Sequence, residues 1–535
     1  MTKPALDIRD LSLRIDGAEI LSEVALSLAP GEITGLVGRS GSGKSMTALA
    51  AMGLAPARAE VFGEVLLNGE NLLEKSDAEM CAVRGGAVGM IFQEPMTALN
   101  PLQTIGAQVA ETIFLHSDLP KAAAEKQAAE ALRRAGLPPE EVSPSRYPHE
   151  LSGGQRQRVV IAIAIAMQPK VLIADEPTTA LDVTTQAEIL ALLKRLARED
   201  GMALLMITHD LAVMSSMADR IAVMKDGRIL ETASADAFFS DSLHNAANGL
   251  AAQPVRRKRR ETAAAPRVLL EADHVSCDYA LREKPMFSPA ATFRAVDSVS
   301  FTVREGENVA LVGESGSGKS TLGRALLGLH AVSGGRVRLD GEVFPSTDRK
   351  TLRRLRRKIQ IVFQDPYSSF NPRQTVGRII AEPFHLFDAP PDQAETETRV
   401  ADVLTAVGLS PDDMAKRPHA FSGGQRQRIA IARALVTEPT LIVLDEATSA
   451  LDVVSRNRIL DLLMRLAEER GVSYLFITHD LTVVRDVADR VMVMKSGRIV
   501  EENETAALFE APREAYTRQL IAAAPVMRRG RRASA

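Results

Sequence analysis

The sequence predicts an α/β protein built as two tandem domains, each with a mostly parallel core sheet. Two observations support this fold class: a set of segments occurs twice in the same order, and short apolar runs alternate with helical patterns in each half. The segment Leu151–Arg158, LSGGQRQR, returns 270 residues later (421 − 151) as Phe421–Arg428, FSGGQRQR. Solenoid repeats have periods of about 20–50 residues, so this spacing indicates a duplicated domain.

Length and composition are those of a globular protein with more than one domain. At 535 residues, with 45% hydrophobic and 25% charged residues, the chain has ample apolar material for a core in each half. A formal net charge of −3 gives no chain-wide basic surface, so we expect no nucleic-acid partner. The two cysteines, Cys81 and Cys277, lie far apart, which argues against a disulfide framework or a cysteine zinc site and fits a reducing cytosol.

No segment has the length of a membrane span. The first residues, MTKPALDIRD, lack the charged-then-apolar pattern of a secretory signal. The longest apolar run, Val159–Met167, is well short of the about 18 residues that a membrane-spanning helix needs. We therefore expect a buried helix there and a chain that does not span a membrane by itself.

Four segments are predicted along the chain: a first domain over residues 1–250, a linker over 251–267, a second domain over 268–526 and a basic tail over 527–535. The linker is rich in alanine and carries the run RRKRR (256–260), which is either a solvated charge cluster or a patch for nucleic acid or lipid. The solvated cluster is favoured, and the run RRLRRK (353–358) is likewise predicted to be one exposed helical face.

Short apolar runs mark the strands of each core. In the first half these are EITGLVG (32–38), VLIAD (171–175) and ALLMIT (203–208), and the second half has LIVLD (441–445) in the place of VLIAD. Strands that are buried on both faces of a parallel sheet have this continuous apolar character. The helical patterns between the runs indicate a doubly wound α/β core.

A glycine-rich loop follows the first of these runs in each half. GRSGSGKS (38–45) and GESGSGKS (313–320) match the pattern GxxxxGK[ST], in which backbone N–H groups wrap a phosphate at the start of a helix. Lys44 and Lys319 would reach the β- and γ-phosphates, and Ser45 and Ser320 would ligand Mg²⁺. A chance glycine-rich turn is excluded because the match occurs twice in the same context. The other predicted contacts are Gly38, Ser40, Gly41 and Gly43, with Gly313, Ser315, Gly316, Gly318 and Thr321 in the second half.

Two acids end one predicted strand of each half. Asp175 and Asp445 are placed to hold Mg²⁺ through water, and Glu176 and Glu446 to polarise an attacking water. Carboxylates at a strand end are otherwise solvated turn residues, but their position downstream of a phosphate loop favours catalysis. His209 and His479 follow the next strand in the context ITHD and are predicted to sense the γ-phosphate; a lone histidine is usually structural, but this one recurs.

Both halves contain the same motifs in one order, which is phosphate loop, FQ(E/D)P, SGGQ, DE, ALD and THD. In these motifs and their order, each half resembles the nucleotide-binding domain of ABC transporters over nearly all of its length. The resemblance implies ATP and Mg²⁺ as cofactors and, beside each P-loop NTPase core, an antiparallel β subdomain and a helical subdomain. It also implies ATP hydrolysis coupled to transport.

In that family two such domains pair head to tail, and here the pairing would occur within one chain. The resemblance implies that the signature loop of each half closes over ATP held by the lysine of the other half. Asp182 and Asp452 of the ALD motifs would lie along the same seam. The implied signature contacts are Ser152, Gly154 and Gln155 for the Lys319 site, and Ser422, Gly424 and Gln425 for the Lys44 site.

Two further positions follow from the resemblance. Gln93 and Gln364 match the loop that senses Mg²⁺ and the attacking water and that leads to the surface gripping the membrane subunit. Tyr279 is placed to stack on adenine in the second half, whereas Ile15 takes that place in the first. Stacking contributes about 1 kcal/mol, so we expect somewhat weaker ATP binding at the first site.

The segments 93–101, 364–377 and 511–525 resemble the ATPases of dipeptide, oligopeptide, glutathione and nickel importers, although the counterpart of 511–525 at 238–254 has lost its Tyr-Thr-Arg element. This implies a motor subunit for short peptides or related solutes at the cytoplasmic face of the inner membrane. Its implied partners are two transmembrane permease subunits and a periplasmic solute-binding protein.

Three alternatives to an importer motor fit the sequence less well. Tandem translation factors of the same superfamily act on the ribosome but carry a long charged helical linker, unlike the short Ala-rich segment here. Tandem sugar-importer ATPases as a rule have one degraded catalytic half, and an inert nucleotide-binding scaffold would not need the motifs. Both halves keep every motif, which disfavours the last two.

Overall fold

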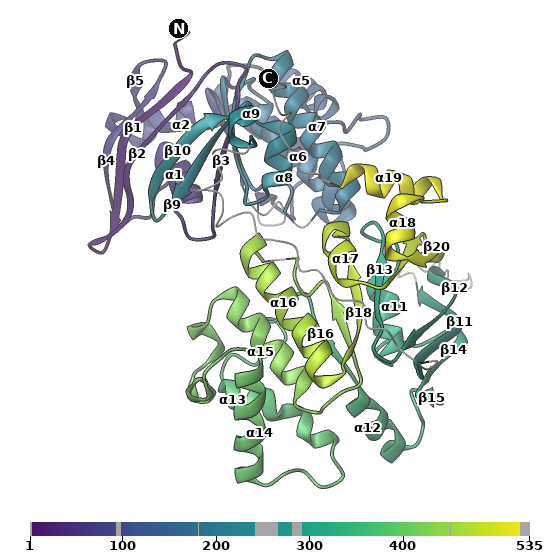
Figure 1. Cartoon of the computed structure of the whole chain (residues 1–535). Helices are drawn as coiled ribbons and strands as arrows, with labels where there is room; N and C mark the ends of the chain where they lie inside the picture. Colours follow the sequence, from purple (N-terminus) through teal and green to yellow (C-terminus); the bar gives the residue numbers. More distant parts are fainter. Residues whose placement is uncertain are drawn as a thin grey trace, which may run out of the picture.

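The computed structural model describes residues 3–92, 98–179, 181–240, 266–280, 292–449 and 451–524, and every structural statement below refers to these residues. Two halves, up to residue 240 and from residue 266, build the same set of layers (Figure 1). The run RRKRR and the predicted tail lie outside the described residues.

In the first half, the strands are β1 (Leu6–Ile15), β2 (Ala18–Leu28), β3 (Ile33–Gly38), β4 (Ala59–Leu67), β5 (Glu70–Asn71), β6 (Val88–Ile91), β7 (Val171–Asp175), β8 (Ala203–Ile207), β9 (Arg220–Lys225) and β10 (Arg228–Ser234). The helices are α1 (Lys44–Ala51), α2 (Asp77–Val83), α4 (Ile105–His116), α5 (Lys121–Arg134), α6 (Gly153–Ile165), α7 (Val183–Glu199), α8 (Leu211–Met217) and α9 (Ala235–Phe238).

In the second half, the strands are β11 (Val268–Ala280), β12 (Thr292–Arg304), β13 (Asn308–Val312), β14 (Gly334–Leu339), β15 (Glu342–Phe344), β16 (Ile359–Val362), β17 (Leu441–Asp445), β18 (Ser473–Thr478), β19 (Arg490–Lys495) and β20 (Arg498–Glu504). The helices are α11 (Lys319–Leu326), α12 (Arg349–Lys358), α13 (Val376–Ala381), α14 (Gln393–Ala406), α15 (Gly423–Leu435), α16 (Val453–Arg470), α17 (Leu481–Val487), α18 (Thr505–Glu510) and α19 (Ala515–Ala523).

Each core sheet is mostly parallel, as the sequence predicts. The first has the strand order β10-β9-β3-β8-β7-β6 and the second the equivalent order β16-β17-β18-β13-β19-β20. All neighbours are parallel except the last hairpin of each half, β9 with β10 and β19 with β20. The apolar runs form β3, β7, β8 and β17, and every residue of these strands is buried.

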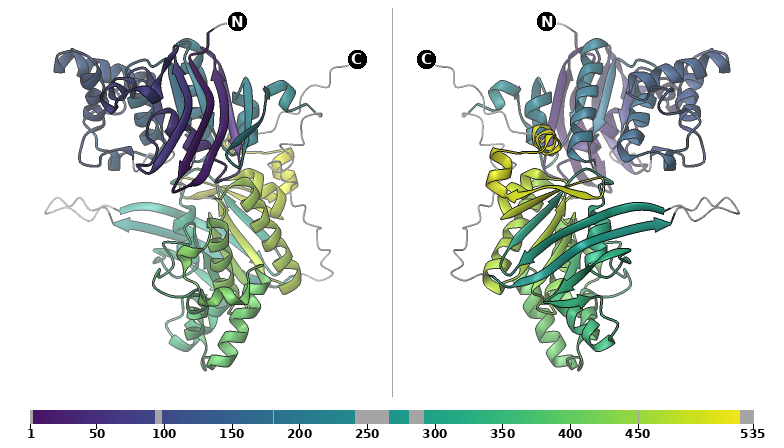
Figure 2. Two further views of the ribbon diagram at one scale, coloured as in Figure 1. Left: turned by 90° about the vertical axis from the view of Figure 1, so that its left-hand side faces the viewer. Right: turned by 90° about the vertical axis from the view of Figure 1, so that its right-hand side faces the viewer.

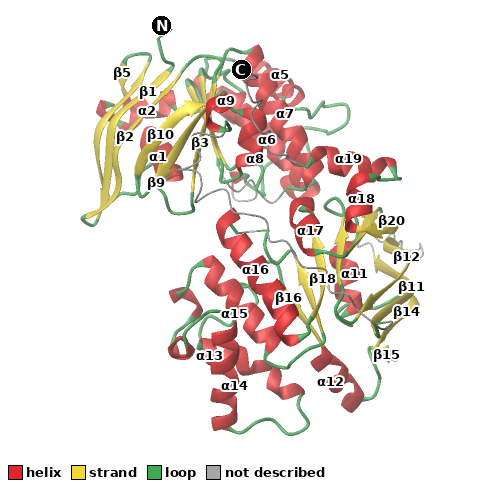
Figure 3. Cartoon of the chain, in the orientation of Figure 1, coloured by secondary structure: helices red, strands yellow, loops and turns green. Residues whose placement is uncertain are grey.

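Two further layers flank each core sheet, and both were expected. A four-stranded antiparallel sheet, β2-β1-β4-β5 or β12-β11-β14-β15, shares one apolar core with α1 or α11 and one face of the parallel sheet. Helices cover the other face, including α4 to α7 in the first half and α13 to α16 in the second (Figure 3). Figure 2 shows the hairpin of β11 and β12 projecting from the second half.

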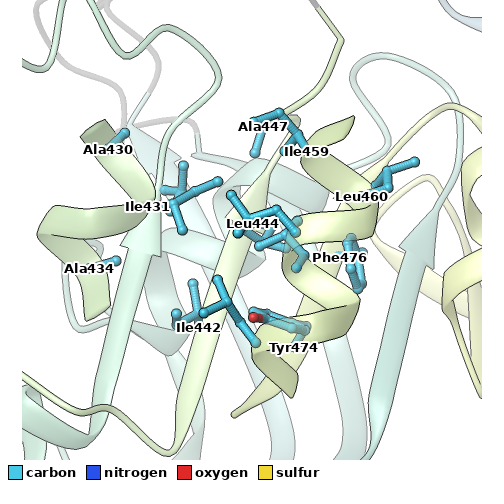
Figure 4. Close-up of a cluster of buried hydrophobic side chains, with 14 of the residues drawn as sticks. Ala430, Ile431, Ala434, Ile442, Leu444, Ala447, Ile459, Leu460, Tyr474 and Phe476 are labelled. Carbon is cyan, nitrogen blue, oxygen red and sulfur yellow. The ribbon is translucent and has the colours of Figure 1, made fainter. Parts of the chain in front are cut away.

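The core of the second half illustrates how the motifs are anchored. Ile431 of α15, Leu444 of β17 and Ile459 of α16 belong to one buried cluster with Phe476 of β18 (Figure 4). The signature helix and the strand that ends in the acid pair are therefore packed together. In the first half, most of the run Val159–Met167 lies in α6, which confirms the predicted buried helix.

The basic helix α12 differs from the prediction of a simple solvated face. Arg354 pairs with Glu342 at 2.5 Å, and the Arg357 guanidinium lies 4.0 Å from the ring centroid of Phe387. Lys358 pairs with Asp340, and Leu355 is fully buried. Long basic side chains cover apolar surface with their stems while their charged ends find partners. Arg353 and Arg354 are exposed, as predicted, whereas residues 356–358 are partly buried.

The two halves meet through the last helix of the chain. Helix α19 belongs to the second half but packs against α7 of the first half, as Figure 1 shows. Among the described residues, every helix is too short or too polar to cross a membrane.

Candidate functional site

The first glycine-rich loop joins the end of β3 to the start of α1. Gly43, the residue before α1, has a φ of 104°, a left-handed conformation that residues with a side chain rarely adopt. The loop closes around the Lys44 ammonium, whose Nζ donates to the carbonyl oxygens of Gly38 at 2.9 Å and Arg39 at 3.0 Å. The lysine is thus fixed at the helix start, where backbone N–H groups favour an anion.

The second loop has the same construction. Gly318 has a φ of 105°, and Lys319 Nζ donates to the carbonyl oxygens of Gly313 at 2.8 Å and Glu314 at 2.7 Å. Both lysines are buried, whereas the loop tips are exposed. The exposed tip residues are Ser40 and Gly41 in the first half and Ser315 and Gly316 in the second.

A serine and an aspartate face each other beyond each lysine. Ser320 Oγ donates to Asp445 Oδ1 at 3.2 Å, and in the first half the Ser45 side chain also hydrogen-bonds to Asp175. Burial raises the pKa of both aspartates, and the serine hydrogen bonds oppose this shift. Asp175 Oδ1 is buried without a hydrogen-bond partner among the described residues.

These residues fit a magnesium ion. Hydroxyl and carboxylate oxygens are the hard ligands that Mg²⁺ prefers, and Mg²⁺ is usually held by one or two carboxylates together with substrate phosphates. The described residues contain no cluster of three or more His, Cys, Asp or Glu that could hold a metal alone. Ser45 with Asp175, and Ser320 with Asp445, would therefore share the ion with a bound nucleotide.

The predicted glutamate and histidine lie together in both halves. His209 Nδ1 is 2.9 Å from Glu176 Oε1, and His479 Nδ1 is 3.3 Å from Glu446 Oε1. Thr179 Oγ1 donates to the other oxygen of Glu176 at 3.0 Å, a contact that the sequence motifs did not reveal. Both glutamates have a φ of 48°, in the left-handed region, which costs about 1–3 kcal/mol for a residue with a side chain.

The charges around the second site favour the ionised form of the Glu446 carboxylate. Burial lowers the pKa of Lys44 and of Lys319, and the neighbouring carboxylates oppose that change. Burial disfavours the charge of Glu446, but the hydrogen bond from His479 and the charges of His479 and Lys319 lower the Glu446 pKa overall. Glu446 is therefore ionised at neutral pH and can accept a proton from water.

The signature loops begin helices by a capping box. Ser152 accepts from the Gln155 backbone N–H at 3.2 Å, while Gln155 Oε1 accepts from the Ser152 N–H at 3.0 Å. Ser422 and Gln425 make the same pair at the start of α15. The spacing S-x-x-Q is the sequence signal that could have revealed this box. In the first signature, a Cβ on Gly154 would lie 2.4 Å from a side-chain atom of Thr185, so a larger residue there would require Thr185 to shift.

Residues from opposite halves come together at each lysine. Asp452, from the second half, is among the carboxylates whose charge acts on Lys44, and it also interacts with His209. Asp182, from the first half, acts in the same way on Lys319. The charge of the ALD aspartate of each half therefore reaches the phosphate-loop lysine of the other half.

The remaining predicted positions are less closely joined to the site. Gln364 is exposed in the loop after β16, next to the strand that ends at Asp445, and Gln93 lies outside the described residues. The Tyr279 hydroxyl is 3.2 Å from Thr321 Oγ1, which places its ring beside the helix of the second phosphate loop. Ile15 ends β1, partly buried against the core of the first half.

Replacing Asp175 by asparagine is expected to raise the thermal unfolding midpoint of the nucleotide-free protein at neutral pH. Because burial raises the folded-state pKa above the unfolded value, ionisation destabilises the fold above that pKa, and the penalty disappears in acid. Calorimetry across pH measures the effect, and the gain should shrink as the pH falls. The exposed Asp10→Asn variant is the control; an unchanged or lower midpoint for Asp175→Asn would contradict the assignment.

Comparison with known proteins agrees with this construction. The family model described as ABC transporter matches residues 21–179 and 296–449, once in each half. YejF of Agrobacterium fabrum, a peptidoglycan transport ATP-binding protein, is 45% identical over 98% of this chain and 97% of its own length. GsiA of Salmonella paratyphi A, a glutathione import ATP-binding protein, is 44% identical over 97% of this chain and 88% of its own length. The predicted family, fold class and ATPase activity are confirmed: the chain belongs to the ABC transporter family, as a transport ATPase with two fused copies of the family's ATP-binding domain.

Proposed function

We propose that the chain is the ATP-hydrolysing motor subunit of a bacterial importer for short peptides or related small solutes. YejF is named for peptidoglycan transport and GsiA for glutathione import. Peptidoglycan and glutathione both contain peptide-like groups, which supports a solute of this kind. The proposed domains are residues 1–250 and 268–526, joined by the linker 251–267. The subunit would act at the cytoplasmic face of the inner membrane with two permease subunits and a periplasmic solute-binding protein.

Two composite ATP sites are the core of the proposal. Each combines the phosphate loop, acid pair and histidine of one half with the signature loop of the other. One observation supports this arrangement: each ALD aspartate interacts electrostatically with the phosphate-loop lysine of the other half. Asp452 interacts with Lys44, and Asp182 interacts with Lys319. ATP would draw the halves together, hydrolysis would release them, and the Gln93 and Gln364 loops would pass the motion to the permeases.

Catalysis would rest on positioning and charge. Glu176 and Glu446 would each accept a proton from the attacking water, with His209 and His479 holding their Oε1 atoms. Lys44 and Lys319 would stabilise the charge that develops on the γ-phosphate. Bound Mg²⁺ would neutralise phosphate charge at the serine and aspartate pairs.

Co-purification tests the importer assignment. The tagged full chain, expressed in its native host and extracted with mild detergent, is expected to retain two integral membrane proteins encoded beside it. Deletion of the gene should abolish uptake of short peptides, and the Glu176→Gln, Glu446→Gln chain should fail to restore it. Retention of ribosomal RNA in place of membrane proteins would instead favour the translation-factor alternative.

A further inference from the structure

A buried tyrosine near the C-terminus reaches the second phosphate loop. Tyr516 lies in α19 and is only 6% exposed, and its hydroxyl accepts from the backbone N–H of Glu314 at 3.0 Å. Glu314 is the second residue of the loop GESGSGKS, and its carbonyl oxygen accepts from Lys319 Nζ at 2.7 Å. The tyrosine therefore holds the residue whose carbonyl positions the lysine ammonium.

The ring is fixed from several sides. Lys495 Nζ lies 4.6 Å from the ring centroid, a cation–π distance. The buried carboxylate of Glu501 accepts from the backbone N–H groups of Arg513 at 2.8 Å and Glu514 at 3.1 Å, which secures the start of α19. Burial raises the Tyr516 pKa to about 12, so the hydroxyl stays neutral across the physiological range.

Helix α19 also connects this loop to the other half. It packs on α7 of the first half, and Asp182, the residue that caps the start of α7, interacts electrostatically with both Tyr516 and Lys319. The second phosphate loop therefore contacts the C-terminal helix, which in turn packs on the helix that follows the first-half ALD motif, at the boundary visible in Figure 1.

The first half cannot build this contact. Arg39 takes the place of Glu314, and its carbonyl accepts from Lys44 in the same manner. The sequence has five tyrosines, of which Tyr147 is the only one before residue 266, and Tyr147 stacks on His149 with ring centroids 5.7 Å apart. No first-half tyrosine is therefore available to hold the Arg39 peptide.

We propose that Tyr516 is a positioning residue for the second nucleotide site, which it ties to the first half, and that the first site lacks this support. The inference rests on the proposed function of Lys319 in ATP binding. It makes the two sites unequal for a reason other than the adenine contact. Among the described residues, a tyrosine outside the core sheet braces the second phosphate loop, and no tyrosine braces the first.

Equilibrium binding of Mg²⁺·ATP to the full chain tests the proposal. All variants carry Glu176→Gln and Glu446→Gln to prevent turnover. Adding Lys44→Ala leaves only the second site open to ATP, and adding Lys319→Ala leaves only the first. With the second site open, Tyr516→Phe is expected to raise the Kd for ATP about 2- to 10-fold, the worth of one neutral hydrogen bond. With the first site open, the same change should leave the Kd unaltered.

Tyr474→Phe is the matched control. Tyr474 is also a buried tyrosine of the second half, and its hydroxyl has no hydrogen-bond partner among the described residues. This variant should leave both Kd values unchanged. A Tyr516→Phe chain with an unchanged Kd at the second site, or with equal changes at both sites, would overturn the proposal. If the Lys44→Ala chain with intact Tyr516 bound no ATP, the assignment of the second site itself would fail instead.

Discussion

A chain that carries both Glu176→Gln and Glu446→Gln is expected to hydrolyse ATP about 10²–10⁴-fold more slowly than the unaltered chain, the usual contribution of general acid–base help. The amide keeps the size of the side chain and the contact with the histidine, but it cannot accept a proton from water. ATP binding should survive, because the phosphate loops are untouched. Phosphate release at saturating ATP, together with a binding titration, measures both effects.

The matched control is a chain with Glu23→Gln and Glu438→Gln. These two glutamates are exposed and also have left-handed backbones, with φ of 50° and 54°, but they lie outside the acid pairs. Their replacement should leave the rate unchanged. A double variant at Glu176 and Glu446 that kept at least half of the normal rate would remove these residues from catalysis.

Replacing each signature serine by alanine in turn should show that each ATP site contains residues of both halves. In the turnover-deficient chain with only the Lys44 site open, Ser422→Ala is expected to weaken ATP binding about 10- to 100-fold, since hydrogen bonds to charged groups contribute about 1.5–3 kcal/mol. Ser152→Ala should have little effect on that site. With only the Lys319 site open, the two serines should exchange roles.

Each variant is the control for the other in this experiment. Both serines cap a helix through the same capping box, so the loss of helix stability, about 0.5–2 kcal/mol, is matched. A site that responded to the serine of its own half would mean that the signature loops act within a half, and the composite arrangement would be rejected.

The strands and phosphate loops could be predicted because their signals are local. The first four residues of VLIAD are all apolar, as is typical of a strand covered on both faces, and the glycine pattern depends on the loop alone. The antiparallel and helical layers were expected from family resemblance, since their segments carry no comparable local signal.

Contacts that depend on the tertiary arrangement were missed. The left-handed backbone at Glu176 arises where β7 ends beside β8, with the Glu176 N–H donating to the Ile207 carbonyl at 2.9 Å. The contact from Tyr516 to Glu314 joins residues far apart in the chain. The segment around Tyr516 resembles importer ATPases, but nothing in its sequence indicates a phosphate loop as its partner.

The left-handed backbone at Glu176 and Glu446 determines when its energetic penalty is incurred. The strand ends impose this geometry on the nucleotide-free chain, so the unfavourable energy is met once, during folding. Under the proposed mechanism, each turnover would then start with the proton acceptor already oriented, and no nucleotide binding energy would be needed to orient it.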